Sequence, residues 1–309
     1  MKQLRIGTRG SALALWQARS MAEALFAITG LQPEIVIIKT SGDKFQKLSF
    51  SQIGTKGVFI KELEDALLDD RIDLAVHSMK DVPTEMPDGL IIAAIGKRED
   101  VRDALLSAPG TTLASLAKGA QVGTSSLRRQ SQLLHARPDL RMLELRGNVD
   151  TRVEKLKRGD YDAIVLAKAG LDRLGLSANI SQVLPLEVSL PAAGQGAIGI
   201  EARAADAVTC GILAKLEDAE TRSAVTAERA ALAGLGGGCQ VPIGAWGRIE
   251  NGTLLLDIAV LSPDGKQRLF ERVSGIPSAA EAIGKQAAQK LRDAGADALL
   301  DEQSRGTPA

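Results

Sequence analysis

Residues 121–167, QVGTSSLRRQSQLLHARPDLRMLELRGNVDTRVEKLKRGDYDAIVLA, alternate between two patterns. Short apolar runs are typical of buried strands, and longer segments with apolar residues on one face predict helices. Alternating strands and helices indicate βαβ units and hence parallel sheets. The expected strands are 121–123, 142–145 and 163–167, and the expected helices are 126–136 and 149–157.

The same alternation precedes this segment, so two similar α/β units in tandem predict two lobes with a cleft between them. After about residue 217 the pattern changes to a helix, a glycine-rich loop, two strands joined by a turn and a final helix. These elements indicate a small α+β third domain. In the first lobe we expect strands at 4–7, 34–40, 72–77 and 90–95 and helices at 11–28 and 58–68.

The chain has 309 residues, with 38 Lys and Arg against 38 Asp and Glu, so its formal net charge is zero. This balance excludes a polybasic protein, and eight aromatic residues are too few for the stacking platforms of nucleic-acid binders. No apolar stretch has the length of a signal peptide or a membrane span, so we expect a cytoplasmic protein. Two cysteines and two histidines cannot supply a disulfide framework or an ordinary zinc site, and we expect no metal.

Hydroxyl and arginine side chains gather between a strand and a helix in VGTSSLRR, residues 122–129. The start of a helix favours an anion, and Arg128 and Arg129 in the first turn oppose the helix dipole unless an anion relieves them. The alternative is that Ser126 caps the helix and is followed by two solvated arginines. Both interpretations stay open from the residues alone.

Basic residues are dense in the segment 121–158, which contains nine basic and four acidic side chains. Arg146 and Arg152 are expected at the same edge of the sheet as the arginines of 122–129, where α/β sheets bind ligands. Residues 7–11, GTRGS, repeat the arrangement in the first lobe. The sequence therefore predicts a polyanion held by arginines of both lobes.

A polar cluster ends an apolar strand in VHSMKDVP, residues 76–83. Asp81, beside Lys80, is a candidate catalytic carboxylate, and Pro83 prevents a helix from continuing through it. A structural Lys80–Asp81 pair with a capping Asp is the alternative. We expect His77 to be a hydrogen-bonded histidine at the end of a strand rather than a ligand.

Cys239 lies in GGGCQVP, residues 236–242, and a glycine-rich loop exposes a thiol and lets the backbone approach a ligand. Cys210 lies in a helical run and is expected to be a small core residue. Residues 194–199, GQGAIG, match the dinucleotide fingerprint, but we expect a strand rather than a helix after them. We therefore reject nucleotide binding there.

Six motifs together resemble the porphobilinogen deaminase family, in family order from the first strand to the third domain. They are RGS (9–11), HSMKDVP (77–83), GTSSLRR (123–129), LRGN (145–148), PAAGQGA (191–197) and GCQVPIG (238–244). The resemblance implies a hydroxymethylbilane synthase of tetrapyrrole and heme biosynthesis. This transferase joins four porphobilinogen molecules head to tail with loss of ammonia and releases hydroxymethylbilane. A dipyrromethane cofactor, held by Cys239 as a thioether, is also implied.

Asp81 matches the family's catalytic carboxylate, which protonates the leaving amine and stabilises positive charge on the pyrrole nitrogen. The resemblance implies that the cofactor is held by Cys239, Lys80, Asp81, Ser126, Arg128 and Arg129. It also implies that the acetate and propionate groups of the substrate are held by Arg9, Ser11, Arg146, Arg152, Arg173 and Lys56, with Gln195 near the cleft hinge. Gln52 stands where the family usually has a lysine, which puts one carboxylate contact in doubt.

The resemblance further implies lobes like those of type 2 periplasmic binding proteins, with a discontinuous first lobe. The expected domains are 1–96 with 197–216, then 97–196, then 217–309. We expect a monomer that takes a small molecule, binds neither nucleic acid nor membrane, and can hand its product to the next pathway enzyme. The alternative is a non-enzymatic two-lobed binding protein for a dicarboxylate, which the exposed loop thiol disfavours.

Overall fold

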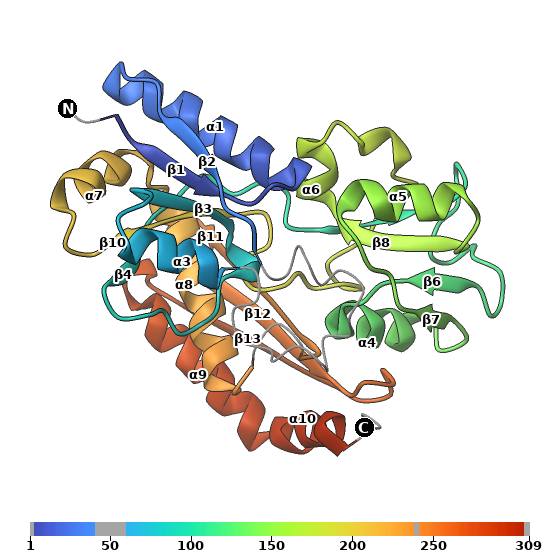
Figure 1. Cartoon of the computed structure of the whole chain (residues 1–309). Helices are drawn as coiled ribbons and strands as arrows, with labels where there is room; N and C mark the ends of the chain where they lie inside the picture. Colours follow the sequence, from blue (N-terminus) through green and yellow to red (C-terminus); the bar gives the residue numbers. More distant parts are fainter. Residues whose placement is uncertain (1–2, 41–59, 238–240, 306–309) are drawn as a thin grey trace. The chain divides into compact units, whose positions relative to one another are not determined.

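The computed structural model describes residues 3–40, 60–237 and 241–305 of the chain (Figure 1). The chain divides into two units, each assembled from two stretches of sequence. Unit 1 comprises Met1–Arg98 and Ala197–Arg222, and unit 2 comprises Glu99–Gly196 and Ser223–Ala309. Among the described helices, none is long and apolar enough to cross a membrane.

Unit 1 contains a five-stranded sheet in the order β2-β1-β3-β10-β4. β1 is parallel to β2 and β3, whereas β10 runs antiparallel to both of its neighbours, β3 and β4. The strands are β1 (Arg5–Thr8), β2 (Glu34–Ile37), β3 (Leu74–Ser78), β4 (Leu90–Ile95) and β10 (Ile198–Arg203). The described helices include α1 (Ala12–Thr29), α3 (Lys61–Leu68) and α7 (Ala207–Leu213), with the 3-10 turns η1 (Met79–Asp81) and η3 (Ala214–Leu216).

Alternate strand positions build a core on each face of this sheet. Leu74 and Val76 of β3 pack with α1, whereas Ala75 between them packs with α3. α1 begins at Ser11, whose hydroxyl accepts a hydrogen bond from a backbone N–H three residues on (3.3 Å). It ends at Gly30, whose φ of 70° suits a helix C-cap. The expected helix at 11–28 is confirmed.

Unit 2 contains a second five-stranded sheet in the order β7-β6-β8-β5-β9. Its strand directions repeat those of unit 1, because β6 is parallel to β7 and β8 while β5 runs antiparallel to β8 and β9. The strands are β5 (Asp103–Leu106), β6 (Gln121–Gly123), β7 (Arg141–Leu143), β8 (Ala163–Ala167) and β9 (Gln182–Val183). The helical elements are α4 (Leu127–Ala136), α5 (Val149–Lys157), α6 (Lys168–Arg173) and η2 (Ser177–Asn179).

The expectation of parallel sheets is wrong for one strand in each lobe, because β10 and β5 each run antiparallel to both of their neighbours. β10 begins directly after the chain returns to unit 1 at Ala197, and β5 begins soon after it enters unit 2 at Glu99. Each strand inserts antiparallel beside strands that come from elsewhere in the sequence. Local periodicity predicts a strand but not its direction, so the sequence alone could not show this.

The C-terminal part of unit 2 is a small α+β domain, as expected from the sequence. Its antiparallel sheet comprises β11 (Ile243–Glu250), β12 (Thr253–Leu261) and β13 (Arg268–Gly275). The helical elements are α8 (Ala219–Gly234), η4 (Pro277–Ala279), α9 (Ala280–Asp293) and α10 (Ala296–Arg305). α9 lies along β12 and β13 and buries Ile283, Ala287 and Leu291 against them (Figure 1).

The segment just before this domain packs in unit 1. The carboxylate of Glu217 accepts a hydrogen bond from the backbone N–H of Ile95 (2.7 Å) and pairs with Arg222. Residues 217–222 are therefore held at the end of β4. The division into three domains with a boundary at 217 stays a prediction.

Candidate functional site

Asp81 and Lys80 follow β3 at the carboxyl end of the strand, in the turn η1. The buried residue Met79 anchors this turn, because its N–H donates to the carbonyl of Ala197 (3.0 Å). Asp81 itself is exposed, and Lys80 is half-buried. The sheet therefore presents an exposed carboxylate on a fixed turn.

Arg9 and Ser11 follow β1, which is the parallel neighbour of β3. Parallel neighbouring strands end at the same edge of a sheet, where α/β proteins bind ligands. Unit 1 therefore brings Arg9, Ser11, Lys80 and Asp81 to one edge. Arg9 is half-buried, and the Ser11 hydroxyl caps α1.

His77 is buried on the face of β3 that packs against α3. Its Nε2 lies 2.8 Å from Oε2 of Glu201, a wholly buried residue of β10. The expectation of a hydrogen-bonded histidine is confirmed.

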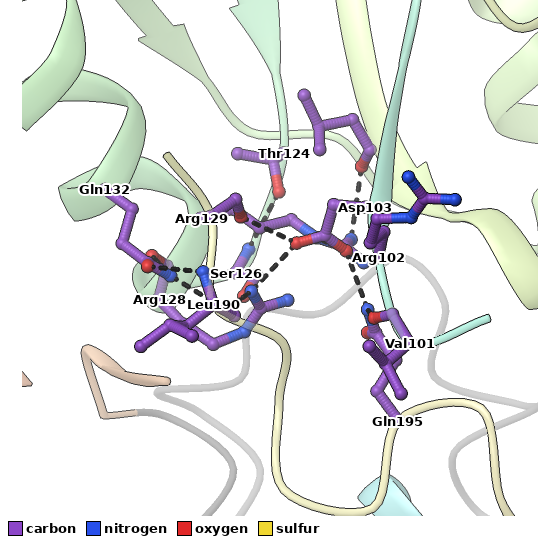
Figure 2. Close-up of polar contacts among 12 residues, drawn as sticks. Val101, Arg102, Asp103, Thr124, Ser126, Arg128, Arg129, Gln132, Leu190 and Gln195 are labelled. Atoms are coloured by element: carbon purple, nitrogen blue, oxygen red, sulfur yellow. Dashed lines mark hydrogen bonds and ion pairs between the residues drawn. The ribbon is translucent and has the colours of Figure 1, made fainter. Parts of the chain in front are cut away.

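Arg128 and Arg129 lie in the first turn of α4, with only 4% and 6% of their surface exposed. Both converge on Asp103, the first residue of β5 (Figure 2). Arg128 Nη1 donates to Asp103 Oδ2 (2.8 Å), and Arg129 Nη2 donates to Asp103 Oδ1 (2.7 Å). The interpretation as two solvated arginines is wrong. An anion does offset their charge at the start of the helix, and it is a side chain of the protein.

Asp103, Arg128 and Arg129 form a buried group, the Asp103 cluster, which has a surplus of positive charge. Burial alone raises the pKa of Asp103, but the charges and hydrogen bonds of Arg128 and Arg129 outweigh it, so the pKa lies below its usual range. The carboxylate is therefore ionised and faces two guanidiniums. Arg128 Nε is buried and has no hydrogen-bond partner in the part of the chain that the structure describes.

The remaining candidates of the second lobe lie around the starts of α4 and α5. Ser126 precedes α4 and makes no capping hydrogen bond with its side chain. Arg146 Nε donates to Glu144 Oε1 (2.7 Å), and Arg152 Nε donates to the carbonyl of Gly147 (2.8 Å). Backbone and acidic partners thus hold both arginines close to the N-terminus of α5.

Gln195 and Arg173 lie close to the segment where the chain leaves unit 2. Arg173 Nη2 donates to the carbonyl of Gly196 (2.7 Å), and burial lowers the pKa of its guanidinium. Gln195 is almost fully buried, and its Nε2 donates to Asp103 Oδ1 (2.9 Å) and to the carbonyl of Val101 (2.7 Å). Gln195 therefore belongs to the same cluster as Arg128 and Arg129.

The basic surplus counted over 121–158 is partly offset by acidic neighbours. Within the segment, Arg137 pairs with Asp139 (2.8 Å) and Lys157 with Glu154 (2.8 Å), but these acids are already included in the count. Acids outside the segment reduce the surplus itself, since Asp103 pairs with Arg128 and Arg129 and Asp160 pairs with Arg158 (2.7 Å). The count therefore overstated the positive charge available to a ligand.

Three residues singled out from the sequence, Cys239, Lys56 and Gln52, lie outside the described residues. Cys210 is half-buried, and burial raises the pKa of its thiol. The GQGAIG segment is followed by the strand β10, not by a helix, so the rejection of a dinucleotide loop is confirmed.

Asp103, Ser189 and Glu228 are polar residues of unit 2 that the sequence analysis did not single out. Ser189 Oγ donates to Asp103 Oδ2 (2.9 Å). Glu228, wholly buried on α8, accepts hydrogen bonds from the backbone N–H groups of Gly194 and Gly247, both at 2.6 Å. The two acids have only a weak signal in the sequence, because each adjoins apolar residues but also an arginine, in RDALL (102–106) and AERAAL (227–232).

Comparison with known families matches nearly the whole chain. Residues 4–210 match the family model described as "Porphobilinogen deaminase, dipyromethane cofactor binding domain". Residues 223–293 match "Porphobilinogen deaminase, C-terminal domain". The first model alone covers more than half of the chain.

Curated relatives carry the same name. A protein named porphobilinogen deaminase from Trichlorobacter lovleyi is 51% identical over 304 residues, which is 97% of this chain and 96% of that protein. Another, from Syntrophotalea carbinolica, is 50% identical over 298 residues, 96% of this chain and 95% of that protein.

Solved structures with a similar arrangement are distant in sequence. A putative methionine-binding lipoprotein from Bacillus subtilis covers 70% of this chain and 90% of its own, at 14% identity and a TM-score of 0.45. A methionine-binding protein covers 69% of this chain and 89% of its own, at 15% identity and the same TM-score.

Proposed function

This chain belongs to the porphobilinogen deaminase family, and from that premise we propose which of its residues carry the reaction. The enzyme is a hydroxymethylbilane synthase, a transferase that joins four porphobilinogen molecules with loss of ammonia. The alternative of a non-enzymatic dicarboxylate-binding protein is set aside, because relatives of near-equal length and about 50% identity are deaminases.

Asp81 is the proposed catalytic acid. The observation that supports it is an exposed carboxylate on the anchored turn η1, at the sheet edge that also carries Arg9, Ser11 and Lys80. The carboxyl donates a proton to the departing amine, and its anion then stabilises the positive charge that develops on the pyrrole nitrogen. Lys80 and Arg9 provide cations for the carboxylates of the same pyrrole.

The family's cofactor is dipyrromethane, and the donor set of unit 2 fits such a group. Its carboxylates require cationic donors, and the Asp103 cluster has one more guanidinium than carboxylate and a buried Arg128 Nε–H that no described atom accepts. We assign the hold on its carboxylates to Ser126, Arg128 and Arg129 of unit 2 and Lys80 of unit 1. Asp81 would bind its pyrrole nitrogens, and Cys239 would attach it as a thioether. When bound, the group supplies the pyrrole carbon to which the first substrate is joined.

Each added porphobilinogen brings two further carboxylates, so the growing chain needs many donors. The proposed donors are Arg9, Ser11, Arg146, Arg152, Arg173, Lys56 and Gln195. A charge-assisted hydrogen bond contributes about 1.5–3 kcal/mol, so several such bonds can retain the intermediate chain.

The experiment combines intact mass with turnover of porphobilinogen. Asp81→Ala shortens an exposed side chain, so we expect a folded protein that still carries the mass of two pyrrole units and turns over roughly 10²- to 10⁴-fold more slowly. Cys239→Ser should lose that mass excess, while Asp88→Ala, at an exposed acid shortly after Asp81 in the sequence, should match the wild type. Activity of Asp81→Ala within a few fold of wild type contradicts the catalytic role. An unmodified yet active wild-type chain contradicts the attachment.

We also propose how the enzyme is organised. It has three domains, 1–96 with 197–216, then 97–196, then 217–309. It is a cytoplasmic monomer that hands its product to the next pathway enzyme. Light scattering during gel filtration tests the monomer, since a mass near twice the sequence value of 32.5 kDa contradicts it.

A further inference from the structure

Asp103 is the centre of the buried polar cluster of unit 2. Its two carboxylate oxygens accept five hydrogen bonds from four side chains, and Figure 2 shows Arg128, Arg129 and Gln195 around it. The donors are Arg128 Nη1 (2.8 Å), Arg129 Nη2 (2.7 Å), Arg129 Nε (3.0 Å), Ser189 Oγ (2.9 Å) and Gln195 Nε2 (2.9 Å). Asp103 is itself 0% exposed.

The two arginines are held from further directions by the backbone. Arg128 Nη1 also donates to the carbonyl of Leu190 (2.5 Å), and Arg129 Nη1 donates to the carbonyl of Val165 (3.1 Å). Gln132 fixes Leu190 in turn, through hydrogen bonds to both its carbonyl (3.0 Å) and its N–H (2.7 Å). Each guanidinium therefore has one orientation instead of the many that a solvated arginine samples.

Burying these charges costs folding free energy, and the stability of the fold does not require it. Among the residues that the structure describes, two buried guanidiniums face one carboxylate, which leaves one positive charge uncompensated. Uncompensated buried charge is strongly unfavourable. A core of apolar side chains would fill the same space without that cost. The cluster makes chemical sense where an acidic ligand supplies the missing negative charge.

We propose that Asp103 is a positioning residue for the deaminase reaction: it orients Arg128 and Arg129 toward the carboxylates of the bound pyrroles. Its hydrogen bond with Gln195 also connects the two arginines to residues 191–196, where the chain leaves unit 2. This inference rests on the proposed function, because it takes the two arginines as carboxylate donors. Asp103 touches no reacting atom and acts only through its neighbours.

Asp103→Asn tests the proposal, and Asp73→Asn is its matched control. Asp73 is 2% exposed and accepts hydrogen bonds from Arg5 Nε (3.0 Å) and Nη2 (2.8 Å), so both variants remove the charge of a buried carboxylate that binds arginine. Asp73 lies in unit 1 and has no role in the proposed site. Both variants should therefore lose stability in urea unfolding.

Only the Asp103 variant should change cofactor loading and the KM for porphobilinogen. We expect its fraction of molecules with the two-pyrrole mass excess to fall clearly below that of wild type, and its KM for porphobilinogen to rise roughly 10- to 100-fold. Asp73→Asn should keep wild-type loading and KM. A folded Asp103→Asn protein with wild-type loading and a KM within twofold overturns the proposal.

Asp103→Glu covers the case in which Asp103→Asn does not fold. It keeps the charge and moves the carboxylate by one methylene, which the surrounding side chains must accommodate. Reduced loading and a raised KM in this charged variant support positioning, and wild-type values overturn it. A wild-type chain without the mass excess would instead contradict the proposed cofactor attachment, so the two failures are distinguishable.

Discussion

Glu64 of α3 is a buried acid with a second buried acid nearby. It is 9% exposed, and Glu201, which holds His77, is 0% exposed. Burial raises the pKa of Glu64, the negative charge of Glu201 raises it further, and His77 opposes these effects. Ionised Glu64 therefore destabilises the folded state.

Glu64→Gln should stabilise the protein at neutral pH but not in acid. A carboxyl with a raised folded pKa contributes most stability below its ordinary pKa, and that stability is lost as the pH rises through the folded value. The difference in free energy of unfolding between variant and wild type should grow in favour of the variant from about pH 4 to about pH 8 in urea titrations. Glu23→Gln, at an exposed acid of α1, should show no such trend. A difference that does not change with pH contradicts the raised pKa.

Sequence reasoning at the level of residues identified the charges but not their partners. Arg128 and Arg129 were recognised as an unusual start to a helix, yet Asp103 lies 25 residues before the first of them. No local pattern shows that β5 will lie beside β8, which is what brings this carboxylate to α4. Which residues surround Asp103 depends on the order of the strands in the sheet, and the residue types alone do not show that order.

At the scale of elements, η1 depends on a glycine in the neighbouring strand. Gly199 of β10 pairs with His77, and a Cβ built on Gly199 would overlap with Met79 Sδ and lie 3.1 Å from Met79 Cγ. Met79 is 1% exposed, so it cannot swing into solvent. The absence of a side chain at Gly199 therefore leaves room for the buried Met79 side chain, through which the Met79–Asp81 turn is packed on the sheet.

Gly199→Ala should impair catalysis more than it impairs folding. The added methyl displaces Met79 and with it Asp81, and small misplacement of a reacting group costs roughly 10- to 100-fold in rate. We expect kcat to fall within that range while circular dichroism stays that of wild type. Gly211→Ala is the matched control, because nothing lies within 4 Å of its Cβ position on α7. A folded Gly199→Ala enzyme with kcat within twofold of wild type contradicts this role of the glycine.

The elements that could be predicted are those with strong periodicity or caps. The expected helices at 126–136 and 149–157 are present as α4 and α5 within one residue at each end. β5 and the six-residue α6, which carries Arg173, were not predicted. The six residues of α6 make fewer than two helical turns, which is too short to show a helical period. β5 opens with a charge that only the folded chain explains.

The zero net charge of the molecule does not show which charged residues are buried or which groups they bind. Asp103 and Glu228 are wholly buried acids of unit 2 that bind groups far away in sequence, over separations of up to 92 and 34 residues. They connect β5, α8, β11 and the 191–196 segment within that unit. The net charge counts buried and exposed residues alike, so it does not show that a few buried carboxylates join segments of unit 2.

Glu228→Gln should loosen the attachment of α8 to the 191–196 segment and to β11. Its carboxylate accepts one backbone N–H on each oxygen, from Gly194 and from Gly247, and an amide offers only one acceptor and turns a donor toward the other N–H. Loss of such a buried acceptor should cost about 2–4 kcal/mol in urea unfolding. Hydrogen exchange should rise in residues 190–196 and in β11, while β1 and β3 of unit 1 stay protected. The control is Glu281→Gln, at an exposed acid of α9 that pairs with Lys285, and it should change neither the stability nor the exchange. Equal stability of Glu228→Gln and wild type, or a rise in exchange spread evenly over both units, would show that Glu228 does not join these segments.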